Sequence, residues 1–436
     1  MFGLPKQGNG IGFHRMTRCF AELGIPQDYF ALRSIVVTGS NGKGSTSRFI
    51  YSLLQQKFSR VGCFTSPHLI DVTERFEING IKISYDEFEK YKNRVLEFNS
   101  RISNDGDFIG AFELFFLVAV QYFHEHSVES VVWEVGIGGR YDPTRMLLAE
   151  VVALTSLDLE HTELLGVTKE LIAYDKLDVV RPRGIAIVSL SVETALNERL
   201  RAYAHVSDRT IHLLSETCSI LSPVVKAGRQ YFTIHELDNG NHQLDREFSI
   251  PLIGLHQAEN ALTSIETVNV FLTRHDKSLT DIQIQTAFSQ TSWPGRLEQI
   301  SIDPSIWIDV GHTPDALRRV IHQILQLYPR AELLVVYGVS YNKNISEITR
   351  LIEANFDAIV LTRAYKNGTD VERLAEYIQD KQKVKAAFDR LEDAVSYAIA
   401  EGARKGKIVI VLGGLFLAVE FKHAFNGENP QTLQFF

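Results

Sequence analysis

The length and composition of the chain predict a folded protein of two domains. Its 436 residues exceed what a single hydrophobic core usually serves, and 45% of them are hydrophobic while 22% are charged. The formal net charge of -8 argues against a protein that binds nucleic acid through clustered lysines and arginines. We therefore expect a small-molecule partner.

The cysteines indicate the redox compartment of the protein, and the apolar runs indicate whether the chain is secreted or crosses a membrane. Cys19, Cys63 and Cys218 lie far apart and form no C-x-x-C pair, so neither a disulfide framework nor a zinc site is predicted. Residues 1–15 lack the apolar stretch of a secretory signal, and the longest uncharged apolar run, 408–419, is too short to cross a bilayer. We expect a cytoplasmic monomer without nucleic-acid or membrane partners.

Short β-branched runs alternate with amphipathic helical stretches in the first half of the chain. Residues 34–38 predict a strand, and the stretch that follows has Ile50, Leu53 and Leu54 at helical spacing. Further apolar runs bounded by Gly, Asp or Pro predict buried parallel strands at 131–135, 151–157 and 185–190. This alternation is typical of an α/β fold with a mostly parallel sheet.

The pattern changes between residues 207 and 250. Segments 230–236 and 243–250 flank Asp-Asn-Gly-Asn at 238–241, which predicts a β-hairpin and a small β excursion. A second α/β series begins after Trp-Pro-Gly at 293–295, with strands predicted at 307–310, 333–337, 358–362 and 408–412. We therefore predict one domain over residues 1–293 and another over 294–436.

The strongest local signal is a glycine-rich turn between the first strand and the first helix. It consists of Gly39, Ser40, Asn41, Gly42, Lys43, Gly44 and Ser45. The glycines let backbone N–H groups approach phosphate oxygens, the lysine adds a positive charge, and the helix directs its N-terminal dipole at the anion. Ser45 or Thr46 could reach a metal ion. A plain turn with a solvated lysine is the alternative, and we favour nucleotide binding by about ten to one.

This loop resembles the G-T-N-G-K-G-S loop of the Mur ligase superfamily, in particular that of the folylpolyglutamate synthase/dihydrofolate synthase family. Other motifs of that family follow in its order between residues 10 and 420: T-S-P-H-L at 65–69, E-R-F at 74–76, F-E at 112–113, E-V-G-I-G-G-R at 134–140, H-T at 161–162, Lys176, G-L-H-Q at 254–257, N-A at 260–261, P-G-R at 294–296, and Asp309 with His312 and Pro314. The resemblance implies a P-loop-type ATPase domain with a mostly parallel sheet, followed by a C-terminal Rossmann-like α/β ligase domain.

The resemblance also implies a reaction. In this family an acid attacks the γ-phosphate of ATP to give an acyl phosphate, which an amino group captures as an amide. The expected activity is addition of L-glutamate to dihydropteroate or reduced folates, with ATP and Mg²⁺, and with K⁺ as a further candidate cation. Two alternatives stay open: a related ligase acting on a non-folate acid, and a nucleotide-binding protein without ligase activity.

Family positions assign roles to individual residues. Catalytic roles are implied for Lys43, Glu134, His161 and Lys176. Metal ligation is implied for Ser66, Glu134 and His161. ATP contacts are implied for the glycine-rich loop and for Asn260, Arg296 and Asp309. Substrate contacts are implied for Phe112, Glu113, Arg140, Asp142 and His312.

Several of these residues have ordinary explanations when they are considered alone. Glu134 ends a strand and would be a solvated edge residue, while His161 would be a structural hydrogen-bonding partner. Lys176 would be an exposed helical lysine, whereas the resemblance matches it to a lysine carbamylated by CO₂. Asp309 could equally cap its strand, and Arg296 could be a surface charge.

The sequence departs from the family motifs around the expected substrates. The departures are Gly110 in place of Thr, D-P-T-R at 142–145 in place of D-A-T-N, Glu160 in place of Asp, D-V-G-H-T-P at 309–314 in place of D-G-A-H-N-P, N-K-N at 342–344 in place of D-K-D, and G-G-L at 413–415 in place of G-S-L. Arg145 adds charge and Thr313 lacks an amide, so either could change which acid or amino acid is accepted.

Overall fold

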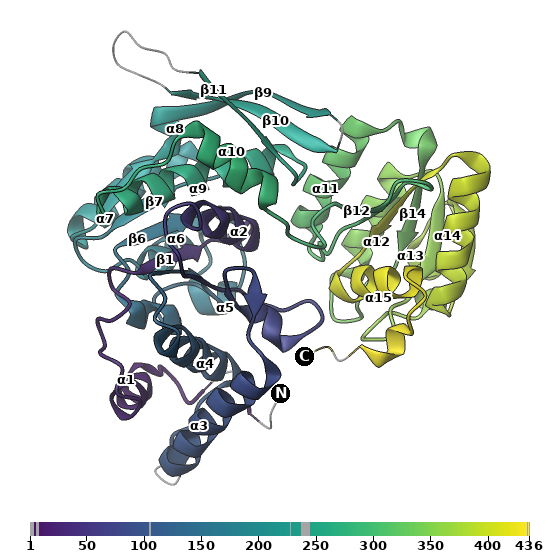
Figure 1. Ribbon diagram of the computed structural model, residues 1–436. Coiled ribbons are helices and arrows are strands. Elements are labelled where there is room, and N and C mark those ends of the chain that lie inside the picture. The colour runs from purple at the N-terminus through teal and green to yellow at the C-terminus, as the bar shows by residue number, and fades with distance from the viewer. Residues whose placement is uncertain are drawn as a thin grey trace.

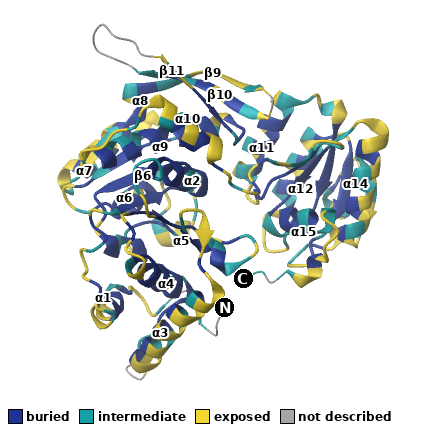
Figure 2. Ribbon diagram, in the orientation of Figure 1, coloured by how far each residue is buried: buried dark blue, intermediate teal, exposed yellow. Residues whose placement is uncertain are grey.

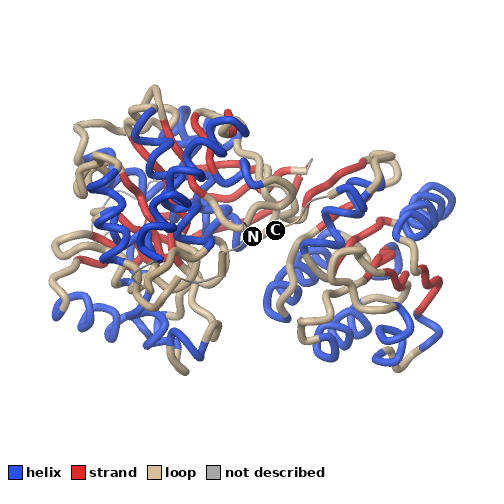
Figure 3. The backbone as a smooth tube through the Cα atoms, turned by 90° about the horizontal axis from the view of Figure 1, so that it is seen from below, coloured by secondary structure: helices blue, strands red, loops and turns tan. Residues whose placement is uncertain are grey.

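The protein contains two large open sheets in separate lobes, with a smaller sheet beside them (Figure 1). The computed structural model describes residues 4–5, 8–103, 106–226, 228–236, 245–433 and 435. Helices flank the strands in both lobes, as the view from below also shows (Figure 3). This confirms the α/β class.

The first sheet has eight strands and is parallel except at one edge. In spatial order its strands are β4 (Ile81–Lys82), β3 (Phe76–Ile78), β2 (Val61–Phe64), β5 (Ser130–Glu134), β1 (Ser34–Thr38), β6 (Val151–Leu154), β7 (Ile185–Val188) and β8 (Thr210–Leu213). The antiparallel pairs in this sheet are β2 with β3 and β3 with β4. The central strands are buried, as their unbroken apolar runs predicted (Figure 2).

Helices cover both faces of this sheet. One face packs against α1 (Phe13–Glu22), α3 (Tyr85–Ser103), α4 (Ala111–Glu125), α6 (Lys169–Leu177) and α7 (Asn197–Val206). The other packs against α2 (Lys43–Leu54), α9 (Leu255–Thr273) and α10 (Asp281–Gln290). Two short helices, α5 (Thr162–Leu165) and α8 (Leu214–Thr217), lie in connecting segments. No helix among the described residues is long and apolar enough to span a membrane.

A three-stranded antiparallel sheet adjoins both lobes. It is formed by β9 (Cys218–Lys226), β10 (Arg229–Glu236) and β11 (Asp245–Ile250). Val225 of β9 and the nearby Ile253 pack against the apolar core of the second lobe. The two predicted hairpin strands are present, whereas the predicted turn at 238–241 lies outside the described residues.

The second sheet has six strands and is parallel except for β12. Its order is β12 (Glu298–Ser301), β13 (Ile306–Ile308), β17 (Ile408–Leu412), β14 (Leu333–Tyr337), β15 (Ile359–Thr362) and β16 (Val384–Phe388). One face is covered by α11 (Pro314–Leu327), α12 (Ile345–Asn355) and α13 (Val371–Tyr377), and the other by α14 (Leu391–Lys405) and α15 (Leu415–Phe425). A domain boundary between residues 293 and 294 stays a prediction.

Several departures from the family motifs fit this second lobe without strain. Thr313 caps α11 by accepting a hydrogen bond from the Ala316 amide, and Asn344 caps α12 in the same way through the Glu347 amide. Thr and Asn are both among the preferred N-cap residues, so both helices keep a side-chain cap. Gly414, which stands in place of the family's Ser, has a φ of 147°, a backbone conformation that favours glycine.

A buried carboxyl group makes the stability of the second lobe depend on pH. Glu420 of α15 is 1% exposed, and its carboxylate accepts hydrogen bonds from the backbone amides of Tyr365 (2.6 Å) and Lys366 (3.0 Å). Burial raises the pKa of Glu420 to about 7. Because this pKa lies above the unfolded value, its stabilisation is complete below about pH 4 and is lost as the pH rises through 7.

We therefore expect this group to lower the free energy of unfolding by about 3 kcal/mol between pH 4 and pH 8. Glu420→Gln should lack that part of the pH dependence, because the amide does not ionise. Urea unfolding of both proteins across this pH range, followed by circular dichroism, measures the difference. Equal pH slopes for the two proteins would contradict the expectation.

Candidate nucleotide and metal site

The glycine-rich loop between β1 and α2 fits tightly between its neighbours. Gly39 and Gly42 have φ values of 144° and 84°, which favour glycine. A side chain at Gly39 would collide with Thr155, and one at Gly42 would place its Cβ 2.6 Å from Asn260 Oδ1. The loop therefore requires glycine at both positions, and the predicted ATP ligand Asn260 lies directly against it.

The segment that follows β6 holds the loop in place. The Asn41 amide donates to Ser156 Oγ (2.9 Å), and the Asn41 carbonyl accepts from Thr155 Oγ1 (2.6 Å). The Asn41 side chain donates to Asp158 Oδ2 (2.7 Å), and the Asp158 amide donates to Ser40 Oγ (3.0 Å). The strand predicted at 151–157 ends at 154, because the following residues leave the sheet to make these contacts.

Lys43 begins α2 and folds back over the loop. Its Nζ donates to the carbonyls of Gly39 (2.7 Å) and Ser40 (3.2 Å). The ammonium group and the N-terminal end of the α2 dipole therefore both favour binding of an anion at the loop. In the same turn, the buried Thr46 hydroxyl has no hydrogen-bond partner among the described residues.

Glu134 is buried at the end of β5, one strand away from the loop. Its Oε2 accepts a hydrogen bond from the backbone amide of Ser66 (3.1 Å). Burial raises the pKa of Glu134, and the positive charge of Lys43 opposes that rise, followed by the Ser66 amide and Arg296. The solvated-edge alternative is therefore wrong, and this carboxyl lies within electrostatic reach of both cations.

Lys176 is buried in α6, so the alternative of an exposed helical lysine is wrong as well. Its side chain is 2% exposed, and its Nζ lies 2.9 Å from Glu160 Oε1. Burial lowers the pKa of Lys176 to about 8, the charge of Lys43 adds to this effect, and Glu160 opposes it. A larger share of Lys176 is therefore present as the free amine near neutral pH. The free amine is the form that reacts with CO₂.

His161 occupies a different setting from the other predicted metal ligands. Its backbone is left-handed, with a φ of 45°, and its side chain is 44% exposed. Its Nδ1 lies 3.9 Å from a carboxylate oxygen of Glu163. No cluster of three or more His, Cys, Asp or Glu side chains suited to a metal occurs in the described part of the chain. Metal ligation by His161 and by Ser66 stays a prediction.

The linker and the second sheet contribute Arg296, Asp309 and His312. The buried Asp309 carboxylate accepts hydrogen bonds from the amides of Leu297 (2.9 Å) and Gly311 (2.7 Å), so it acts as the cap that its sequence position allowed. Burial raises the pKa of Asp309 and Arg296 opposes this, while burial lowers the pKa of His312. Arg296 thus lies within electrostatic reach of carboxylates from both lobes.

Comparison with known proteins matches this arrangement to one family. Residues 37–268 match the Mur ligase middle domain, and residues 295–415 match the Mur ligase glutamate ligase domain. The chain belongs to the Mur ligase family. Its relatives place it in the folylpolyglutamate synthase/dihydrofolate synthase branch, so the resemblance found in the sequence is confirmed.

Three of these relatives cover nearly the whole chain. The dihydrofolate synthase/folylpolyglutamate synthase of Bacillus subtilis is 28% identical over 96% of both proteins. The apo form of folylpolyglutamate synthase from L. casei superposes with a TM-score of 0.83 at 25% identity, over 97% of each chain. A folylpolyglutamate synthase in complex with AMPPCP and folate gives a TM-score of 0.78 at 25% identity, over 96% of each.

In this Mur ligase, most of the predicted substrate residues make contacts within the framework. Asp142 accepts hydrogen bonds from the amides of Gly136 (3.0 Å) and Thr144 (2.9 Å), and Arg140 pairs with Asp178 (2.7 Å). Phe112 is different, because its ring lies over Gly136 in the loop that follows β5. These contacts favour structural roles for Asp142 and Arg140, and direct substrate contact by either stays a prediction.

Glu113 also has a structural partner. Its carboxylate lies 2.7 Å from Nη2 of Arg15, which is fully buried, and it accepts a hydrogen bond from the Gly110 amide (2.8 Å) at the start of α4. We expect Glu113→Ala to lower the free energy of unfolding by about 3 kcal/mol, because it leaves a buried guanidinium with less compensation. Urea unfolding measures this. Unchanged stability with a much higher KM for the acid substrate would instead assign Glu113 to substrate binding.

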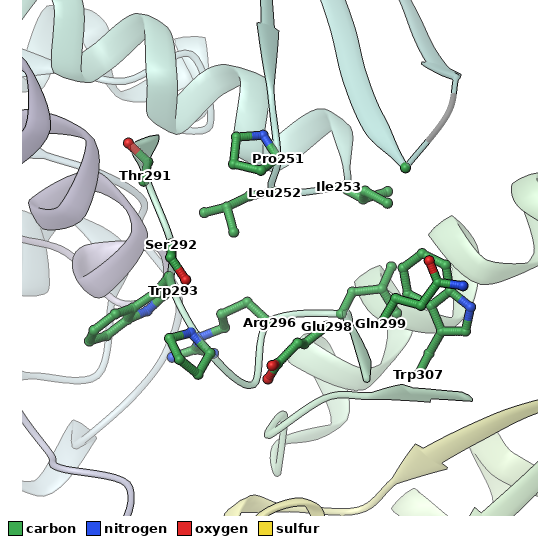
Figure 4. Close-up of a pocket in the computed structure, with 13 residues that line it drawn as sticks. Pro251, Leu252, Ile253, Thr291, Ser292, Trp293, Arg296, Glu298, Gln299 and Trp307 are labelled. Carbon is green, nitrogen blue, oxygen red and sulfur yellow. The ribbon is translucent and has the colours of Figure 1, made fainter. Parts of the chain in front are cut away.

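The structure adds residues that the sequence did not indicate. Trp293 lies against Gly44, where an added Cβ would be 2.8 Å from its ring, and the Arg48 guanidinium stacks on the same ring at 4.7 Å. Beside it is a pocket of about 230 Å³, where residues 251–253 face the linker and Trp307 (Figure 4). The signal in the sequence for the contact between Trp293 and the glycine-rich loop is the position of Trp293 directly before the P-G-R motif.

Proposed function

We propose that the protein is an ATP-dependent ligase that adds L-glutamate to dihydropteroate or a reduced folate through an acyl phosphate. The observation that carries the proposal is the buried Glu134 carboxylate on the strand next to the glycine-rich loop, within electrostatic reach of Lys43 and Arg296. The names of its relatives support the substrates, and the complex with AMPPCP and folate supports both ligand classes.

ATP would bridge the two lobes. The loop amides and Lys43 would hold the phosphates, because they combine a cation with a helix N-terminus. Asn260 lies against Gly42, and Arg296 and Asp309 approach from the linker and the second sheet. Contacts from both sides would bring the acceptor amine to the activated acid and exclude water.

Mg²⁺ fits the donors that are present. Mg²⁺ prefers oxygen ligands and is often held by one or two carboxylates together with substrate phosphates, so it needs no dedicated cage. Glu134 offers a buried carboxylate, Ser66 lies beside it, and the Thr46 hydroxyl is buried and unpartnered. When bound, the ion would neutralise charge on the phosphates. The roles of His161 and of K⁺ rest on the resemblance alone.

The chemistry follows in two steps. A carboxylate oxygen of the acid forms a bond to the γ-phosphorus of ATP while the bond to the β,γ-bridging oxygen breaks, and ADP leaves. The amino group of L-glutamate then attacks the acyl carbon, giving the amide, inorganic phosphate and a proton. Lys43 stabilises the charge on the transferred phosphoryl group, which makes positioning and electrostatics the main contributions of the protein.

One assay tests this function against its alternatives. The protein is incubated with ATP, Mg²⁺, L-glutamate and either dihydropteroate or a reduced folate, and ADP and the amide product are measured. Acid-dependent ADP release with a glutamyl product is the expected result. Turnover only with other carboxylic acids would support the related ligase, and nucleotide binding without ADP release would support the inactive protein. Monomeric state and cytoplasmic location stay predictions.

A further inference from the structure

An ion pair between the lobes ends on the same carboxylate that holds the glycine-rich loop. Arg319 of α11 extends from the second lobe, and its Nη2 lies 3.1 Å from Asp158 Oδ2. That same oxygen accepts the hydrogen bond from Asn41 Nδ2 (2.7 Å). The two side chains are 38% and 21% exposed, so the pair is only partly screened by solvent. The loop and the second lobe thus share one acceptor atom.

The charges around Arg319 show that it faces the first lobe. Burial lowers the pKa of His256 to about 4, and the positive charges of Arg319 and then Arg296 contribute to that shift. Burial raises the pKa of Glu259, which a hydrogen bond from Ser191 and the charge of Arg319 both oppose. Arg319 therefore pairs with Asp158 and lies within electrostatic reach of the N-terminal part of α9.

The neighbouring arginine offers a natural comparison. Arg318, one residue earlier on α11, pairs with Asp315 and Glu347. Both partners belong to the second lobe, so the charge of Arg318 is satisfied without reaching the loop. Two consecutive arginines on one helix therefore differ in whether they join the two lobes.

We propose that Arg319 is a positioning residue for ligation, which couples the placement of the second lobe to the glycine-rich loop through Asp158 and Asn41. The coupling has a simple electrostatic reason. Asp158 is an anion next to a loop that would take the phosphates of ATP, and Arg319 offsets its charge only while the lobes are together. Occupancy of the loop and the placement of the second lobe then favour each other reciprocally. The catalytic part of this proposal rests on the proposed function.

Kinetics test the coupling with matched variants. Arg319→Gln should lower kcat about fivefold and change the KM for the acid much less, while Arg318→Gln should leave both close to wild type. Arg319→Lys should restore part of kcat. In an Asp158→Asn background, where the amide can still accept from Asn41, Arg319→Gln should have little further effect. Equal effects of the two arginine substitutions, or full additivity with Asp158→Asn, would overturn the proposal.

A second readout does not need ligase activity. Spin labels on cysteines introduced at Val206 and Ile302, which are exposed on the first and second lobes, report the distance between them. We expect Arg319→Gln, and not Arg318→Gln, to broaden this distance distribution and to weaken the narrowing caused by AMPPCP. One outcome is that the wild type makes no amide while Arg319→Gln alone broadens the distance distribution. In that case the proposed function fails and the coupling stands. Identical distributions for all three proteins would refute the coupling itself.

Discussion

Replacing Lys43 by alanine is expected to lower kcat for amide formation by about a thousandfold. The ammonium group lies on the loop carbonyls at the start of α2, where the phosphates of ATP would bind. Loss of one preorganised charge at a developing anion typically costs two to three orders of magnitude, and phosphoryl transfer depends strongly on such charges. ADP release and the amide product, measured at saturating ATP, report the effect.

The control for this variant is Lys57→Ala, in the turn that follows the other end of α2. It removes a lysine of the same region without touching the loop, so activity should remain close to wild type. A Lys43→Ala protein that keeps more than about a tenth of the wild-type kcat would contradict the assigned role. Circular dichroism of both variants checks that the fold is retained.

Replacing Lys176 by alanine is expected to lower kcat by about a hundredfold, the usual upper range for groups that support a metal or its ligands. The matched control is Lys169→Ala on the same helix, because that lysine is partly exposed and pairs with Glu193. Equal activity of the two variants would show that the buried amine has no part in the reaction. Partial rescue of Lys176→Ala by a small carboxylic acid would support a carboxylate-like group at this position.

Carbamylation of Lys176 should increase with pH. Because the pKa of Lys176 is lowered to about 8, the amine is mostly charged below that pH and mostly free above it, and only the free amine reacts with CO₂. The ammonium form pairs with Glu160, so the ion pair and the carbamate are mutually exclusive states of the same nitrogen. Isotopically labelled bicarbonate, followed by NMR, should give a signal that grows between about pH 7 and pH 9 and is absent in Lys176→Ala.

The elements of the fold were largely predictable from local patterns. Strands β1, β14 and β17 agree with their predicted bounds, because uninterrupted β-branched runs flanked by Gly, Asp or Pro have few other stable environments. Strands β2, β3, β4, β8, β9, β12 and β16 were missed. Edge strands such as β4, with both residues exposed, lack an apolar pattern and form only when a partner strand is present.

The candidate site was predictable in part. Glycines with left-handed backbone, a lysine and a helix start are neighbours in the chain, so their geometry is local and the phosphate loop could be recognised. The burial of Lys176 and Glu134 could not be predicted from the sequence, because burial depends on which distant elements cover a residue. The pairing of Glu113 with Arg15 could not be predicted either, since Arg15 lies almost a hundred residues earlier in the chain.

The sequence by itself determined the α/β class, the two series of strands, the phosphate loop and the family, because each depends on short-range pattern or on the order of motifs. Only the tertiary structure decided which charges lie near one another: Lys176 pairs with Glu160, Arg319 pairs with Asp158, and Glu134 lies within electrostatic reach of Lys43. Electrostatic interactions depend on distance and on the exclusion of water, and both are set by the packing of helices and sheets far apart in the chain.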